Sequence, residues 1–215
     1  MNWKIYIWFI LAGSGAGALV YYKKGVPLYL KALPVFLLAT FIVEYTGGVR
    51  SDNGRETMSL YNVFTTVEFV FYFWMLRQII NGRFAKMLLL HLLWIYPLLV
   101  ILNKTLFQTG LQFHSITFGV GGLLTIATTI IYFFELFQLN KPVILSREPS
   151  FWICSGLLFF YACTFPVFAV VNFFRNPSSI VLKNLGSIFA IMNILLYSSF
   201  IMASLCRIRI RKSSS

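Results

Sequence analysis

Long apolar runs, separated by short polar connections, are the feature that most constrains how this chain can fold. A helix that crosses a hydrocarbon core of ~30 Å needs about 20 apolar residues. The sequence supplies seven segments near that length, at residues 5–22, 28–45, 60–80, 87–102, 115–137, 151–174 and 181–206. Within a bilayer, helices are one of the two structures that satisfy their own backbone hydrogen bonds. The predicted fold class is therefore all-α, a polytopic membrane protein built as a bundle of seven transmembrane helices.

The composition and the connections support one membrane domain. Of the 215 residues, 59% are hydrophobic and only 11% are charged, whereas about a quarter of the residues in a soluble domain are charged. The longest connections, residues 47–58 and 139–150, are too short to form a separate soluble domain. We therefore expect a single seven-helix transmembrane domain over residues 1–215, with a basic cytoplasmic tail at 207–215.

The distribution of Lys and Arg predicts the orientation, because cytoplasmic loops are enriched in both. Of the 18 basic residues, twelve fall on the side opposite the N-terminus. The six on the N-terminal side are Lys4, Arg50, Arg55, Lys104, Arg175 and Lys183. The N-terminus is thus expected outside and the C-terminus in the cytoplasm. Basic residues at the ends of apolar runs contact lipid headgroups, so we expect membrane lipids as partners and no nucleic acid.

The cysteines and histidines give no pattern of a metal site. The three cysteines lie in apolar stretches without CxxC spacing, which supports neither a disulfide framework nor a zinc site. His91 and His114 fall near opposite surfaces of the predicted bundle and cannot share a metal ion. We expect no cofactor.

Glu68 is the strongest candidate for a functional residue. An ionisable group at membrane depth costs about 2.5–3.5 kcal/mol on the insertion scale, so it is a functional candidate by default. Tyr61, Thr65, Glu68 and Tyr72 follow at spacings of four, three and four and therefore share one helical face. This stripe predicts a site for a proton, a cation or a polar headgroup; equally, Glu68 could be a hydrogen-bonded residue that fixes helix packing.

Further polar residues fall in the outer halves of other predicted spans. Glu44 and Asn62 lie near the outer ends of the second and third segments. Glu44 is either a simple interfacial carboxylate, which is the favoured interpretation, or part of a site with Asn62 and Glu68. In the seventh segment, Asn193 and Tyr197 lie one helical turn apart, deep enough to line a cavity or to bond a neighbouring helix.

The inner half holds a second group of candidates. Glu135 falls near the cytoplasmic end of the fifth segment, and we expect it to form an ion pair with Arg77 or Arg83. His91 falls near the inner end of the fourth segment, where it is either an interfacial hydrogen-bonding residue or a proton relay.

Small residues and prolines indicate how the helices pack. Gly13 and Gly17 form a small-x-x-x-small pair, which permits close helix approach. Pro97 and Pro166 interrupt the fourth and sixth segments, and each removes an i to i−4 hydrogen bond. A proline kink can frame a pocket.

Four short motifs give the chain a resemblance to a group of small uncharacterised bacterial seven-helix membrane proteins. The motifs are Tyr61-Asn62 with Glu68, Tyr132 to Leu136, Phe151 to Ile153, and Asn193 to Leu195. The resemblance covers most of the chain and implies a multi-pass protein of the bacterial inner membrane. It implies no established activity.

Several function classes remain open from the sequence. The first is a binding or sensory module for a small amphiphile or lipid, acting through a partner protein in the membrane or cytoplasm. The second is a proton-coupled carrier with Glu68 as proton acceptor, and the third is a structural subunit of a membrane complex. An intramembrane lipid-modifying enzyme ranks last, because no nucleophile and base stand at a recognisable spacing.

Overall fold

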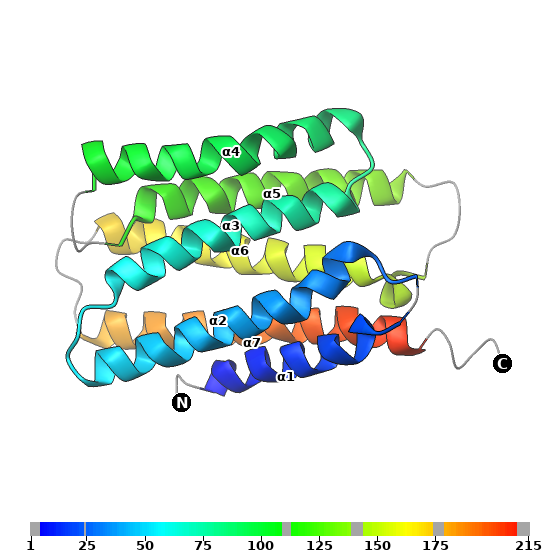
Figure 1. Ribbon diagram of the computed structural model, residues 1–215. Coiled ribbons are helices and arrows are strands. Elements are labelled where there is room, and N and C mark those ends of the chain that lie inside the picture. The colour runs from blue at the N-terminus through cyan, green and yellow to red at the C-terminus, as the bar shows by residue number, and fades with distance from the viewer. Residues whose placement is uncertain (1–4, 24, 109–112, 139–143, 174–178, 210–215) are drawn as a thin grey trace. The chain divides into compact units, whose positions relative to one another are not determined.

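The computed structural model describes residues 5–23, 25–108, 113–138, 144–173 and 179–209, with side chains omitted at 168–173, 179–184 and 207–209. Within these ranges the chain folds into seven α-helices and no strand, which confirms the all-α class (Figure 1). The helices are α1 (Ile5–Tyr21), α2 (Leu28–Asp52), α3 (Met58–Ile79), α4 (Arg83–Leu106), α5 (Ser115–Phe137), α6 (Pro149–Phe173) and α7 (Ser179–Arg209); a 3₁₀ turn, η1 (Leu145–Arg147), precedes α6.

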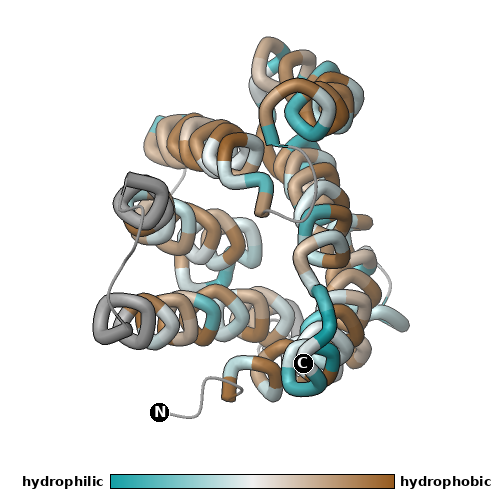
Figure 2. The backbone as a smooth tube through the Cα atoms, turned by 90° about the vertical axis from the view of Figure 1, so that its left-hand side faces the viewer, coloured by the Kyte–Doolittle hydropathy of each residue, from teal (hydrophilic) through white to brown (hydrophobic). Residues whose placement is uncertain are grey.

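Five of these helices contain apolar stretches long enough to cross a membrane. They are α2, α4, α5, the Pro149–Val167 part of α6 and the Leu185–Cys206 part of α7. Apolar residues predominate along the helices in Figure 2. Of the other two, α1 is shorter, with 17 residues, and α3 does not reach the length and hydropathy that the five combine. The chain is thus compatible with a multi-pass membrane protein.

The second helix is longer than predicted, and its end has a clear local cause. The prediction ended it at residue 45, but α2 continues through Gly47 to Asp52. Gly54 then adopts a φ of 67°, and two bonds close the end: Arg55 N–H to the Arg50 carbonyl and Gly54 N–H to the Ser51 carbonyl. This is a Schellman motif, which requires a left-handed residue one position after the cap. The helix therefore ends at the glycine with positive φ, not at the first glycine in the sequence.

The other helix ends agree more closely with the sequence. Helix α5 has the predicted bounds, and α3 differs from its predicted segment by one or two residues at each end. Helix α4 has four more residues at each end than the predicted fourth segment. Helix α7 continues to Arg209, so the first three residues of the predicted tail are helical, and the remainder of the tail lies outside the described residues.

The contacts divide the chain into two compact units, each described by itself. The first contains residues 1–41 and 139–215, and the second contains residues 42–138. The single domain expected from the sequence stays a prediction.

Small residues bring the helices of the first unit together. A Cβ added to Gly17 would lie 2.9 Å from Cβ of Pro34, and one added to Gly13 would lie 3.0 Å from Leu37. The Ser14 hydroxyl donates to the Pro34 carbonyl at 3.0 Å. The small-x-x-x-small pair therefore does pack α1 closely against another helix, α2. Helix α7 packs against both α1 and α6.

The second unit is built around α3, α4 and α5, which pack against one another (Figure 1). Its core contains an aromatic cluster in which the Phe69 ring contacts the rings of Phe73, Tyr96 and Phe118. A Cβ on Gly121 of α5 would lie 2.7 Å from the Phe69 ring, so glycine allows α3 and α5 to approach. The Tyr96 hydroxyl donates to the Thr117 carbonyl at 3.1 Å, which joins α4 to α5.

Candidate functional site

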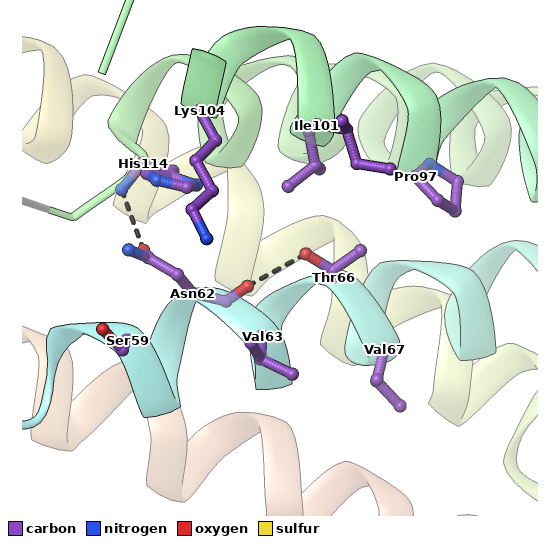
Figure 3. A pocket seen from close by; sticks show the side chains of 10 residues that line it. Ser59, Asn62, Val63, Thr66, Val67, Pro97, Ile101, Lys104 and His114 are labelled. Carbon is purple, nitrogen blue, oxygen red and sulfur yellow. Dashed lines mark hydrogen bonds between the residues drawn. The ribbon is translucent and has the colours of Figure 1, made fainter. Parts of the chain in front are cut away.

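A groove of about 360 Å³ lies between α3 and α4 in the second unit (Figure 3). Pocket volumes that hold small molecules are about 300–1,000 Å³, so this groove falls at the lower end of that range. The ten lining residues are Ser59, Asn62, Val63, Thr66, Val67, Pro97, Val100, Ile101, Lys104 and His114. They separate into a polar end and an apolar wall.

The polar end contains a buried histidine whose ring has no hydrogen-bond partner among the described residues. The His114 side chain is 6% exposed, and neither ring nitrogen has a partner in the described part of the chain. His114 is the N-cap residue of α5, and its position is fixed by its backbone: its N–H donates to Oδ1 of Asn62 at 2.9 Å, and its carbonyl accepts from the Thr117 hydroxyl. The backbone is therefore anchored while the imidazole lines the groove.

Lys104 supplies the only formal charge in the groove lining. It stands in the last turn of α4, and its side chain extends from that helix toward α3 in Figure 3. No Asp or Glu is among the ten lining residues. The lysine therefore makes the polar end electropositive, and the histidine adds an uncharged imidazole.

Helix α3 carries the remaining polar side chains of this end. Asn62 is buried in α3, and the Thr66 hydroxyl donates to the Asn62 carbonyl at 2.9 Å. Ser59, Asn62 and Thr66 are three and four residues apart, so they share a helical face beside the stripe that contains Glu68.

The apolar wall is open to the surroundings of the unit. Val63 is 67% exposed and Val67 is 53% exposed on α3, and Ile101 is 58% exposed on α4. Pro97 completes this wall and, lacking an N–H, it leaves a carbonyl of the preceding turn without its helical donor. The proline therefore does line a pocket, as the sequence suggested a proline can.

The Glu68 stripe lies outside the groove lining. The Tyr72 hydroxyl donates to Oε1 of Glu68 at 2.9 Å, and Glu68 is half-buried. The carboxyl group of Glu44 interacts electrostatically with Glu68 and Tyr61. Half-buried Thr65 is on the same helical face as Tyr61 and Glu68.

The Tyr61 ring packs against helix α2 at Gly47. A Cβ on Gly47 of α2 would lie 2.8 Å from Cζ of Tyr61, so the phenol ring packs directly on the α2 backbone. This contact uses the part of α2 that the sequence prediction had placed in a loop.

Glu135 has different partners from the arginines expected. Its two carboxylate oxygens accept the backbone N–H groups of Asn81 at 2.8 Å and Gly82 at 2.9 Å, and among the described residues the predicted ion pair with Arg77 or Arg83 is absent. Gly82 is the N-cap of α4 and has no side chain to accept a bond. The carboxylate satisfies donors at a helix start that would otherwise be unpaired.

The other inner-side candidates do not join Glu135. The Nε of Arg77 is buried without a hydrogen-bond partner in the described chain. The His91 ring is exposed, and its Nδ1 lies 2.7 Å from the Met87 carbonyl one turn back on the same helix. The described contacts therefore do not assemble an inner relay from these residues.

Asn193 and Tyr197 belong to the first unit. The Asn193 amide donates to the Phe189 carbonyl on its own helix at 2.9 Å, and the buried Tyr197 ring makes an edge contact with Phe200. The side chain of Lys183 lies outside the described residues.

Metal binding has no support from the geometry. In the ranges that the structure describes, no three side chains of His, Cys, Asp or Glu come together at a spacing that could hold a metal ion. Cys154 and Cys206 are buried, and none of the three cysteines forms a disulfide in the described part of the chain.

Sequence reasoning found Asn62 but missed His114 and Lys104 as groove residues. The sequence assigns Lys104 only to a side of the membrane, and it excludes His114 only from a metal site shared with His91. The sequence does contain one usable signal: Lys104 and His114 flank the same connection between the fourth and fifth segments, so both lie at the same end of these two segments.

No family model, curated protein or solved structure matches this chain.

Proposed function

We propose that this protein is an integral membrane module that binds a small amphiphile or lipid in the groove between α3 and α4. The observation that carries the proposal is the two-part lining: Asn62, Lys104 and His114 at one end, and Val63, Val67 and Ile101 along the wall.

This arrangement suits a molecule with a polar head and an apolar chain. An alkyl chain that lies against the exposed valines contacts protein on one side and lipid on the other. The polar head then reaches the side chains at the polar end of the groove, which hydrocarbon cannot hydrogen-bond. A wholly polar solute would make no apolar contact with the wall, and a wholly apolar one would leave the His114 ring without a hydrogen bond.

The response to binding is proposed to pass through a partner protein in the membrane or cytoplasm. The described chain is helical over nearly all of its length and carries no separate soluble domain that could itself act as an output.

The membrane arrangement is part of the same proposal. All seven helices cross the bacterial inner membrane, with the N-terminus outside and the C-terminus in the cytoplasm. The support is the excess of Lys and Arg on the C-terminal side. The groove's polar end then faces the outer surface, since Lys104 belongs to the outer set.

The test is to identify the small molecules that copurify with gently solubilised protein by mass spectrometry. The blocking variant is Val63→Phe, which places a phenyl ring in the groove. The matched control is Val35→Phe on α2, because Val35 is 63% exposed and does not line the groove. We expect an amphiphile enriched with the unaltered protein and with Val35→Phe, and at least tenfold depleted with Val63→Phe.

A Glu68→Gln variant separates this proposal from the proton-carrier alternative. Glu68 does not line the groove, so the variant should retain the amphiphile. If the same lipids copurify with all the variants and with an unrelated membrane protein, the groove is not a binding site.

A further inference from the structure

We infer that the ligand of the α3–α4 groove has an anionic headgroup, a carboxylate or a phosphate, bound by the Lys104 ammonium group and the His114 imidazole. This inference rests on the proposed function and adds the chemical class of the ligand.

The unpartnered imidazole is the first observation that points to a ligand. Buried polar groups are nearly always hydrogen-bonded, because leaving one unpaired forfeits the bonds it makes with water. Both ring nitrogens of His114 lack a partner in the described chain although the side chain is 6% exposed. A neutral imidazole always carries one N–H donor. An anionic oxygen in the groove would accept from it.

The charge distribution of the groove selects an anion over a cation. Lys104 is the only formally charged residue among the lining residues, and an ammonium group carries three donors and no acceptor. A cationic headgroup would meet this charge without a carboxylate to compensate for it.

The start of α5 reinforces the same preference. His114 directly precedes the first residue of this 23-residue helix, and a helix N-terminus carries a partial positive charge. The lysine, the histidine and the helix start all belong to the second unit, so the subsite is complete within one unit.

The groove volume favours a ligand with one chain. About 360 Å³ is near the lower limit for sites that enclose small molecules. A headgroup with part of a single alkyl chain fits this space better than a phospholipid with two chains.

The experiment measures binding of defined twelve-carbon amphiphiles to the full chain in phosphatidylcholine nanodiscs, relative to protein-free nanodiscs. The probes are radiolabelled dodecyl phosphate, dodecanoate, dodecanol and dodecyltrimethylammonium at pH 7.5. Inorganic phosphate is added as a separate competitor, because it shares the headgroup chemistry without the chain.

Three variants report on different parts of the site. Lys104→Gln removes the exposed charge, and His114→Gln removes the imidazole but keeps a donor. Lys86→Gln is the matched control, since Lys86 is near the opposite end of α4 and does not line the groove. Val63→Phe blocks the apolar wall, and thermal unfolding confirms that each variant is folded.

We expect dodecyl phosphate and dodecanoate to bind at least tenfold more tightly than dodecanol and dodecyltrimethylammonium. Lys104→Gln should remove most of that difference, His114→Gln should reduce it, and Lys86→Gln should leave it unchanged.

The possible failures are distinguishable. If dodecanol binds as tightly as the anions and Val63→Phe abolishes both, the groove binds amphiphiles but the anionic subsite is wrong. If only inorganic phosphate binds, and does so through Lys104 and His114, the anion chemistry holds and the amphiphile function is wrong. If no probe binds, or if binding is insensitive to Val63, Lys104 and His114, both are overturned.

Discussion

At the scale of single residues, His114 is the most informative side chain in the described structure. Burial and, secondarily, the nearby charge of Lys104 lower the pKa of the His114 imidazole below its ordinary value. The ring is therefore neutral at pH 7. A bound anion would oppose both effects and favour the imidazolium form.

The lowered pKa gives the folded protein a defined pH dependence. In the unfolded chain the imidazole takes up a proton near pH 6.5, whereas in the folded chain it does so only at a lower pH. The unfolded state thus binds more protons in this interval, and stability falls as the pH falls below about 6.5. We expect the unfolding temperature in neutral detergent to drop between pH 7.5 and 5.5, and to drop less in His114→Gln.

His91→Gln is the control for this measurement, because the His91 ring is exposed. It should retain the pH response of the unaltered protein. Equal pH responses in the unaltered protein and in His114→Gln would contradict the assignment to His114.

At the scale of helices, hydropathy was sufficient to locate every described helix but not to place all of their ends. The Ser115–Phe137 helix has no ambiguous flanks, and its bounds were predicted correctly. The end of α2 depends on the φ of Gly54 and on two backbone bonds, which an apolar count does not register.

The candidate site was predictable only in part, for a related reason. Helical spacing correctly grouped residues on one helix, such as Tyr61, Glu68 and Tyr72. It does not state which helix packs against that face. Lys104 and His114 enter the groove because α4 and the start of α5 pack beside α3, and that pairing depends on the contacts of Phe69, which periodicity does not specify.

The contact between Gly121 and Phe69 should therefore be sensitive to a single added methyl group. A Cβ at Gly121 would lie 2.7 Å from ring carbons in the core of the second unit, and overpacking a core costs about 1–3 kcal/mol. We expect the free energy of unfolding of Gly121→Ala, in mixed detergent micelles, to lie below that of an unstrained helical Gly→Ala variant by that amount.

The matched control is Gly186→Ala on α7, where an added Cβ meets nothing within 4 Å. Alanine is the better helix former by about 1 kcal/mol, so this variant should be neutral or more stable. A Gly121→Ala protein as stable as Gly186→Ala would show that the Phe69 contact can relax without cost.

At the scale of the whole molecule, the orientation in the membrane is the property that links the groove to a compartment. In the proposed orientation Lys104 lies outside, and the groove has its polar end at Lys104. Reversing the orientation would expose the same polar end to the cytoplasm and to a different set of amphiphiles.

Reporter fusions test this orientation. A reporter enzyme that is active only outside the cytoplasm should be silent when fused after Ser215. The same reporter inserted after Asn53, in the connection between α2 and α3, should be active. Activity after Ser215 together with silence after Asn53 would invert the topology.

The exposed wall of the groove determines which concentration governs occupancy. Val63, Val67 and Ile101 are open to the surroundings of the unit, so under the proposed function a ligand would arrive sideways from the surrounding leaflet. Its occupancy is then set by its mole fraction among the lipids and not by its aqueous concentration. Binding curves measured at several lipid-to-protein ratios should superimpose only when occupancy is plotted against the mole fraction of the ligand among the lipids. A receptor with this property would measure the composition of its own membrane.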